Sequence, residues 1–351
     1  MTLKMKQLKD DPAYAKSKAD LGLFVEMISI KRGYESQAEI VFNKKYLDQR
    51  IPGMKKDRFG NRYVIIGKNR RPKIMFACHT DTVHSGDGGK QRVLYDSNKK
   101  HIFSSDKNAS CLGADDTTGV WLCLEMIKAG VPGLYVFHRG EEAGCVGSNY
   151  IVDKNPELVK DIKICLSLDR KGIDEVITHQ FASRCASDNL GSALARELNR
   201  ADSSFKYKTS DRGVFTDSQV YSDIVPECLN LGVGYYAQHT KNEYQDVEHM
   251  VKLRKALIKV DWQGLLKHVE RDPKEVRFSL PRPRKNEVSK EVFGDSMEYN
   301  DLYTYVKENP DVITEMLLDM DMSEQDLWEY EYRITVEVDR AAQAVETAEM
   351  R

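Results

Sequence analysis

The sequence predicts an α/β fold in which a mixed, largely parallel sheet is flanked by helices and followed by a C-terminal helical extension. Short β-branched or apolar runs are bounded by glycine, proline or charged residues, as expected of strands in a sheet covered on both faces. Segments with apolar residues at helical spacing alternate with these runs, and such alternation favours parallel strand pairing. Beyond Arg271 the composition changes, which indicates a separate segment.

The individual elements follow from these patterns in chain order. Apolar positions at helical spacing predict two opening helices between residues 17 and 50. Strands are expected at 62–67, 73–79, 133–138, 162–169, 174–180 and 227–233. Helices are expected at 116–129, 145–155, 187–199 and 214–222, and one long helix is expected at 246–270.

The segment after residue 270 divides the chain into two predicted parts. It begins RDPKEVRFSLPRPRKNEVSK and is rich in proline and charge, a composition typical of linkers. We therefore expect a main domain at 1–271, a linker at 272–290 and a helical extension at 291–351. The extension is polar and locally acidic, and its sequence predicts no chemistry.

The composition argues against several classes of partner. The 53 lysines and arginines nearly balance the 55 aspartates and glutamates, so the chain has no basic field that would gather nucleic acid. The seven cysteines are scattered and form no C-x-x-C pair, which is typical of reduced thiols in a cytoplasmic protein. No stretch approaches the roughly 18 apolar residues that cross a bilayer. We expect a cytoplasmic protein with no nucleic-acid or membrane partner.

Five short stretches place histidine or acidic residues where predicted strands end or helices begin. They are ACHTDTV (77–83), LGADDTTG (112–119), HRGEEAG (138–144), LSLDR (166–170) and YYAQHTKNEYQD (235–246). Open α/β sheets build their sites at the carboxyl ends of their strands, so these residues are expected to converge. Imidazole and carboxylate groups without thiolates suit divalent metals such as zinc. The sequence therefore predicts a metal centre.

In this order the five stretches resemble the motifs of the co-catalytic di-zinc exopeptidases. This clan contains aminopeptidases, carboxypeptidases, tripeptidases and deacylases related to peptidase families M20, M28 and M42. The resemblance covers residues 17–270 and implies an aminopeptidase or other small-peptide hydrolase. It also implies two divalent metal ions, zinc or alternatively cobalt or manganese, and a small peptide or an N-acyl amino acid as substrate.

The resemblance assigns a metal-binding role to five residues of this sequence. His79 and Asp169 would bind one metal ion. Glu142 and His239 would bind the second ion, and Asp115 would bridge the pair.

Two further acidic residues receive roles from the same resemblance. Glu141 would be the general base that takes a proton from the attacking water and returns it to the leaving amine. Asp81 would hold the His79 imidazole in the tautomer that ligates the metal. A cis peptide bond is also expected between Asp115 and Asp116, as in relatives.

The sequence departs from this pattern in two ways. Thr117 stands where many relatives carry lysine. Only 239 − 169 = 70 positions separate the last aspartate from the last histidine, and only 115 − 79 = 36 separate the first histidine from the bridging aspartate. These intervals are too short for the inserted domains of families M20 and M42, so we expect a domain without a lid.

Several alternatives stay open at this level. A non-peptidic amidohydrolase or deacylase would use the same motifs, whereas an inactive binding scaffold is disfavoured because the ligand positions and Glu141 are intact. Tyr235 is either a contact to the reaction intermediate or a core residue. Thr216 either lines the site or caps a helix. The formation of a homo-oligomer is open as well.

Overall fold

The computed structural model describes residues 2–4, 8, 14, 17–86, 88–106, 108–180, 183–273, 307, 310, 314 and 317. The chain divides into two compact units, Met1–Pro273 and Lys274–Arg351. The predicted linker and extension lie outside the described residues, apart from 272, 273 and the four isolated positions, which are helical. All the elements named below belong to the first unit.

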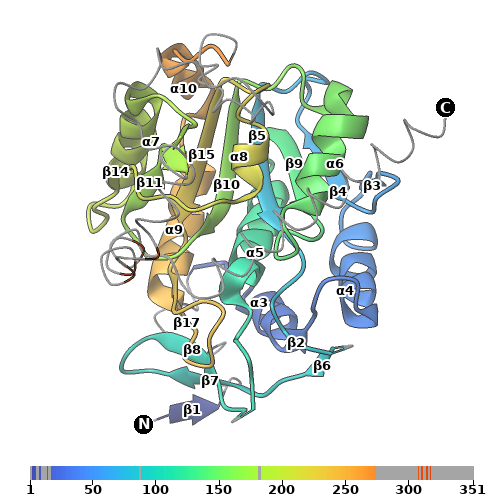
Figure 1. Ribbon diagram of the computed structural model, residues 1–351. Coiled ribbons are helices and arrows are strands. Elements are labelled where there is room, and N and C mark those ends of the chain that lie inside the picture. The colour runs from blue at the N-terminus through green and yellow to red at the C-terminus, as the bar shows by residue number, and fades with distance from the viewer. Residues whose placement is uncertain are drawn as a thin grey trace, which may run out of the picture. The chain divides into compact units, whose positions relative to one another are not determined.

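An eight-stranded mixed sheet forms the centre of the first unit (Figure 1). Its strand order is β14-β11-β15-β10-β5-β9-β4-β3. The strands are β3 (Lys55–Lys56), β4 (Arg62–Ile66), β5 (Ile74–His79), β9 (Gly133–His138), β10 (Ile164–Arg170), β11 (Glu175–Ile177), β14 (Lys208–Ser210) and β15 (Glu227–Gly232). The central strands β15, β10, β5 and β9 are parallel, and antiparallel strands flank them on both sides. The predicted mixed, largely parallel sheet is confirmed.

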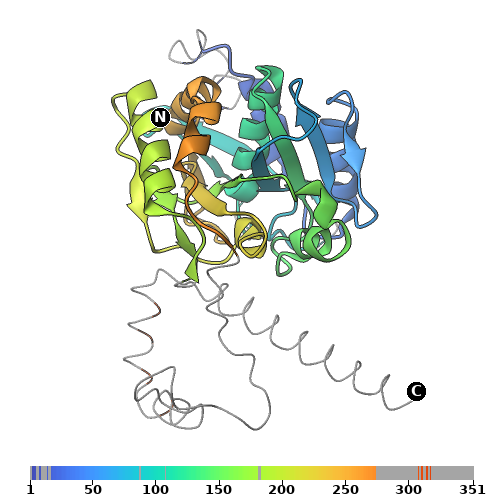
Figure 2. The ribbon, with the colours of Figure 1, turned by 90° about the horizontal axis from the view of Figure 1, so that it is seen from above.

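Helices cover both faces of this sheet, as Figure 2 shows. One face carries α3 (Leu21–Ile28), α5 (Ala114–Lys128), α7 (Asp188–Ala201) and α9 (Val247–Lys259), and the other carries α6 (Val146–Lys154) and α8 (Asp217–Val220). Successive side chains of a strand point to opposite faces. Phe76 of β5 accordingly packs in one apolar cluster with Trp121 of α5, and Met75 packs in another with Ile151 of α6. Both faces of the sheet are thus buried.

The opening helices α3 and α4 (Gln37–Phe42) confirm the prediction for residues 17–50. A π-helix at Asn43–Asp48 continues α4 directly. The buried rings of Phe42 and Tyr46 lie 4.8 Å apart and anchor this segment in the larger apolar cluster.

A second, five-stranded antiparallel sheet was not predicted from the sequence. It contains β1 (Thr2–Lys4), β7 (Val93–Asp96), β8 (His101–Ser104), β17 (Tyr244–Asp246) and β16 (Tyr235–Tyr236). Pairing of β17 with β8 ties the segment around residue 240 to the segment around residue 100. Two short pairs complete the fold: β2 (Ile30–Lys31) with β6 (Gly89–Lys90), and β12 (His179–Gln180) with β13 (Ser183–Arg184).

Three predicted elements differ from the observed ones. The long helix expected at 246–270 is wrong, because α9 ends at Lys259 and Asp261 starts α10 (Trp262–Leu265), where its carboxylate accepts the Gly264 N–H at 2.9 Å. A 3₁₀ turn at Leu266–His268 follows. The strand expected at 174–180 is split, because β11 pairs in the main sheet and β12 pairs with β13. The helix expected at 214–222 is only the four-residue α8.

We predict that a protein ending at Pro273 folds with nearly the melting temperature of the full chain, because both apolar clusters lie within the first unit. A protein ending at His268 should melt several degrees lower. It loses the Arg271 guanidinium, which donates to the carbonyls of Ser222 at 2.7 Å and Pro226 at 2.9 Å. Hydrogen bonds to charged groups contribute about 1.5–3 kcal/mol each. Circular-dichroism melting curves compare the two, and equal destabilisation by both truncations would refute the prediction.

Candidate metal centre

The predicted ligands converge at the carboxyl ends of the central strands, next to the N-terminus of α5. Figure 1 shows β5, β10 and α5, which carry three of them. His79 is the last residue of β5, and Asp169 is the penultimate residue of β10. Asp115 lies at the start of α5. Glu142 follows β9, and His239 lies between β16 and β17 with a backbone φ of 61°, in the left-handed region. Parallel strands place their carboxyl ends at one edge, which explains this convergence.

Asp115 lies between the two histidines. Its Oδ1 is 3.0 Å from His79 Nε2, and its Oδ2 is 3.4 Å from His239 Nε2. One carboxylate thus presents a separate oxygen to each imidazole. The cis peptide bond expected between Asp115 and Asp116 is present.

Each histidine has a further carboxylate beside it. Asp169 Oδ1 lies 3.6 Å from His79 Nε2, and Glu142 Oε1 lies 3.1 Å from His239 Nε2. Within the part of the chain that the structure describes, candidate ligand atoms fall into three groups in which every atom lies within 4.8 Å of the others. These groups are His79, Glu141 and Glu142; His79, Asp116 and Asp169; and Asp115, Glu142 and His239. The arrangement offers two adjacent places for a cation, one at each imidazole.

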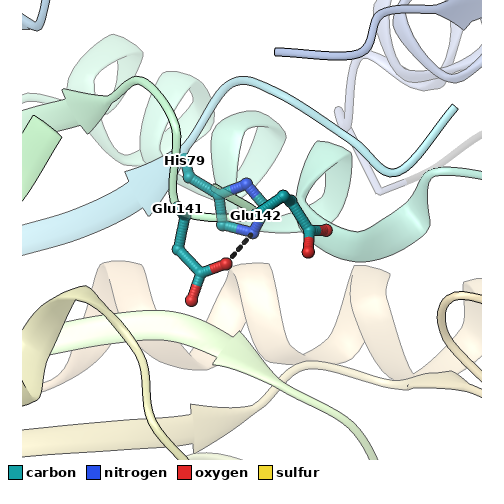
Figure 3. Close-up of side chains that lie close together, drawn as sticks. All are labelled: His79, Glu141 and Glu142. Carbon is teal, nitrogen blue, oxygen red and sulfur yellow. Dashed lines mark ion pairs between the residues drawn. The ribbon is translucent and has the colours of Figure 1, made fainter. Parts of the chain in front are cut away.

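Glu141 and Glu142 diverge from the turn that follows β9 (Figure 3). Glu141 Oε2 lies 3.9 Å from His79 Nε2, so its carboxylate faces the ligand cluster at a longer range than Glu142 does. Burial raises the pKa of Glu141 well above its ordinary value; the charge of His79 opposes this increase, and that of Asp169 adds to it. A carboxyl group with a raised pKa is suited to exchanging protons.

Asp81 holds the turn that carries the two glutamates. Its carboxylate accepts the backbone N–H groups of Gly140 at 2.8 Å and Glu142 at 3.2 Å. Its backbone carbonyl lies 3.1 Å from His79 Nδ1, whereas its carboxylate oxygen lies 3.7 Å from that nitrogen. The residue therefore contacts His79 through its main chain and the glutamate turn through its side chain.

Asp169 is fixed by two hydroxyl groups. Thr216, the residue before α8, donates to Asp169 Oδ2 at 2.7 Å, and Tyr235 donates to Oδ1 at 3.0 Å. Thr216 was expected either to line the site or to cap the helix, and its hydroxyl binds the site carboxylate. Tyr235 is 2 % exposed, so it belongs to the core and contacts a candidate ligand as well.

Glu243 holds the loop that carries Asp115, and sequence reasoning assigned it no role. Its Oε2 accepts the N–H groups of Leu112 at 2.7 Å and Gly113 at 2.8 Å, and its Oε1 accepts the Asp115 N–H at 3.0 Å. Burial, together with the charge of Asp115, raises the pKa of Glu243 to about 7 despite these hydrogen bonds. Its position four residues after His239 was the only available signal.

The charges of the cluster fit bound cations. Burial and the neighbouring charge of Asp115 raise the pKa of Asp169 to about 6. Burial alone would lower the pKa of His79, but the charge of Asp169 and a hydrogen bond to Asp115 raise it well above its ordinary value. Carboxylates gathered in a buried place repel one another, and divalent cations relieve that repulsion. The donor set of imidazole and carboxylate groups suits zinc.

Comparison with known proteins agrees with this geometry. Residues 62–227 match the sequence profile of peptidase family M28. The matched segment is just under half of the chain. The match includes four of the five candidate ligands and ends before His239. No curated protein sequence matches the chain.

Solved structures of low sequence identity share the fold of this chain over 72% of its length. Aminopeptidase PepT from Bacillus cereus aligns with a TM-score of 0.53 at 16% identity, over 72% of this chain and 99% of its own. A tripeptidase from Staphylococcus aureus aligns with a TM-score of 0.54 at 16% identity, over 72% and 98%. A TET aminopeptidase from a marine-sediment thaumarchaeote aligns with a TM-score of 0.50 at 14% identity, over 72% and 100%. The M28 profile match, on this fold, supports a metal-dependent exopeptidase.

We predict that Glu243→Gln weakens Zn²⁺ binding about 10- to 100-fold, the usual loss when a group that orients metal ligands is changed. In the unchanged protein both Glu243 oxygens accept backbone N–H groups. The carboxamide of the variant replaces one of these oxygens with an NH₂ group, which is a donor and cannot accept them. Competition with a chromogenic chelator measures the affinity.

Glu227→Gln is the matched control for this variant. Glu227 is also a buried carboxylate that accepts backbone N–H groups, those of Ser187 at 2.6 Å and Glu270 at 2.8 Å, but it lies at the start of β15. Both variants should lower the melting temperature, and only Glu243→Gln should change zinc affinity. Equal zinc affinities in the two variants would refute the assignment.

Proposed function

We propose that this protein is an aminopeptidase that removes the N-terminal residue of small peptides. The observation that carries the proposal is the Asp115 carboxylate between His79 and His239, with Glu141 Oε2 3.9 Å from His79 Nε2. The names of the structural neighbours, an aminopeptidase and a tripeptidase, support peptides over N-acyl amino acids as substrates.

Two divalent ions would be held by this arrangement, and we favour zinc over cobalt or manganese. His79 and Asp169 would hold one ion, Glu142 and His239 the other, and Asp115 both. When bound, such ions polarise the substrate carbonyl and lower the pKa of water.

Glu141 is the group that we assign to proton transfer. It accepts a proton from the attacking water and delivers it to the nitrogen of the leaving amine as the peptide bond breaks. Glu142 is less suited to this task because its oxygen lies 3.1 Å from His239, in a ligand position. Asp81 fixes both side chains through the backbone of their turn, so the base and the ligand keep their separate directions.

The location and assembly of the protein also remain proposals. Among the described residues, no helix combines the length and apolar character that crossing a membrane requires. All seven cysteines are free and buried, which supports the predicted cytoplasmic location. We retain a homo-oligomer as a hypothesis, to be tested by light scattering of the full chain.

Glu141→Gln should lower kcat about 10²- to 10⁴-fold, because an amide cannot accept the proton of water. Its zinc content should stay near that of the unchanged protein. Glu142→Gln, the neighbouring control, should lose bound zinc as well as activity. Turnover of a panel of aminoacyl and N-acyl amides measures the activity and tests the N-acyl alternative. An active Glu141→Gln protein together with a Glu142→Gln protein of full zinc content would reverse the two roles.

Zinc titration of the metal-free protein should show two ions per chain, at a separation of about 3.5–4 Å in a metal-bound crystal structure. His79→Ala and His239→Ala should each bind one ion tightly, because each removes one imidazole from a different place. Asp115→Asn should weaken the binding of both ions. A protein that binds one ion and gains no activity from a second would exclude the two-metal arrangement.

A further inference from the structure

Arg32 is a fully buried arginine directly after β2, and none of the roles described above uses it. Its exposed fraction is 0%, and its guanidinium carbon lies 4.1 Å from the centre of the Phe42 ring. A buried guanidinium is costly unless its N–H groups and its charge are both satisfied. Its partners therefore indicate what the charge does at this position.

The guanidinium links the segment that carries His79 to the segment that carries Asp115. Its Nε donates to the Thr80 carbonyl at 2.6 Å, and its Nη2 donates to Thr117 Oγ1 at 2.8 Å. Thr80 follows His79 directly, and Thr117 is two residues beyond Asp115. One side chain thus fixes the ends of both segments relative to each other.

The Thr117 hydroxyl connects Arg32 to the loop before α5. It donates to the Gly113 carbonyl and therefore accepts from Arg32. The Arg32 backbone carbonyl also accepts the Thr82 N–H at 3.0 Å. Arg32 consequently holds residues on both sides of Asp81 and the N-terminal loop of α5.

The charge of Arg32 is matched to buried acids next to the ligands. Burial lowers the pKa of Arg32 to about 10, and the carboxylates of Asp81 and Asp116 oppose that decrease, so the group is charged at neutral pH. Asp116 accepts the His79 N–H at 3.2 Å, and Asp81 accepts the N–H groups of the glutamate turn. These acids hold the ligand backbone, and the positive charge of Arg32 interacts with both of them.

We propose that Arg32 is a positioning residue for the metal centre: it holds the His79 and Asp115 segments in register and supplies a buried positive charge beside them. This inference rests on the two-metal site proposed above. The guanidinium donates to the carbonyls of Ile30 and Thr80 and to the Thr117 hydroxyl, so it acts through residues next to the ligands in sequence. Metal affinity should therefore depend on a positive charge in the space between Thr80 and Thr117, whether residue 32 or residue 117 carries that charge.

The test moves the cation from one residue to the other. Arg32→Met removes the charge and should weaken Zn²⁺ binding about 10- to 100-fold. Arg32→Met combined with Thr117→Lys places an ammonium group where the guanidinium met the threonine hydroxyl, and it should recover most of that loss. Thr117→Lys alone sets two cations against each other and should also bind zinc weakly. Zinc affinity of each metal-free protein is measured by competition with a chromogenic chelator, without recourse to activity.

Arg254→Met is the matched control. Arg254 is also a buried arginine, 9 % exposed; it pairs with Glu125 and donates to the Ser17 carbonyl at 3.2 Å, away from the ligands. Its loss should lower the melting temperature and leave zinc affinity unchanged.

The outcomes separate this inference from the proposed function. Failure of the unchanged protein to bind two zinc ions would count against the two-metal site itself. If the unchanged protein binds them, an Arg32→Met protein with equal affinity overturns the role of Arg32. If Arg32→Met does not fold, the double variant decides: a folded, zinc-binding double variant supports the role. A double variant that does not fold, or binds no better than Arg32→Met, overturns it.

Discussion

The crowding of buried carboxylates at one edge of the parallel sheet is the constraint on which the rest of the site depends. Asp115 and Asp169 face the same imidazole nitrogen at 3.0 and 3.6 Å, and Glu141 lies 3.9 Å from it. Like charges at such distances in a place of low dielectric constant are unfavourable unless cations offset them. The histidines and the proposed metal ions offset the repulsion between these carboxylates, and the charge of the buried Arg32 interacts with the acids next to them.

Acids that are not ligands hold the segments that carry the ligands. Asp81 binds the backbone of the glutamate turn, and Glu243 binds the backbone around Asp115. Carboxylates can do this because each accepts several N–H groups at once, which fixes a loop more firmly than a single neutral bond does. The negative charge of the site thus extends one layer beyond the ligands, and Arg32 lies in that layer.

The sequence was sufficient for the parts of the site that depend on local pattern. Apolar strands with an acid or histidine at the end are visible in the sequence itself, and they led to His79 and Asp169. Glu243 was not predictable, because its partners are the backbone of Leu112 to Asp115, about 130 residues earlier. Strands of two or three residues, such as β16 (Tyr235–Tyr236), exist through pairing with distant strands and leave too short a pattern to identify. The break after α9 likewise depends on one capping aspartate.

Among the described residues the main sheet ends at β3, whose two residues, Lys55 and Lys56, are both exposed. An unpaired strand edge is a template on which another chain can add a strand, and lysines on the edge oppose such addition by repulsion and by the cost of removing them from water. Two copies of this protein that met at this edge would bring four ammonium groups together. Edge lysines therefore disfavour growth of a continuous sheet from molecule to molecule on this side.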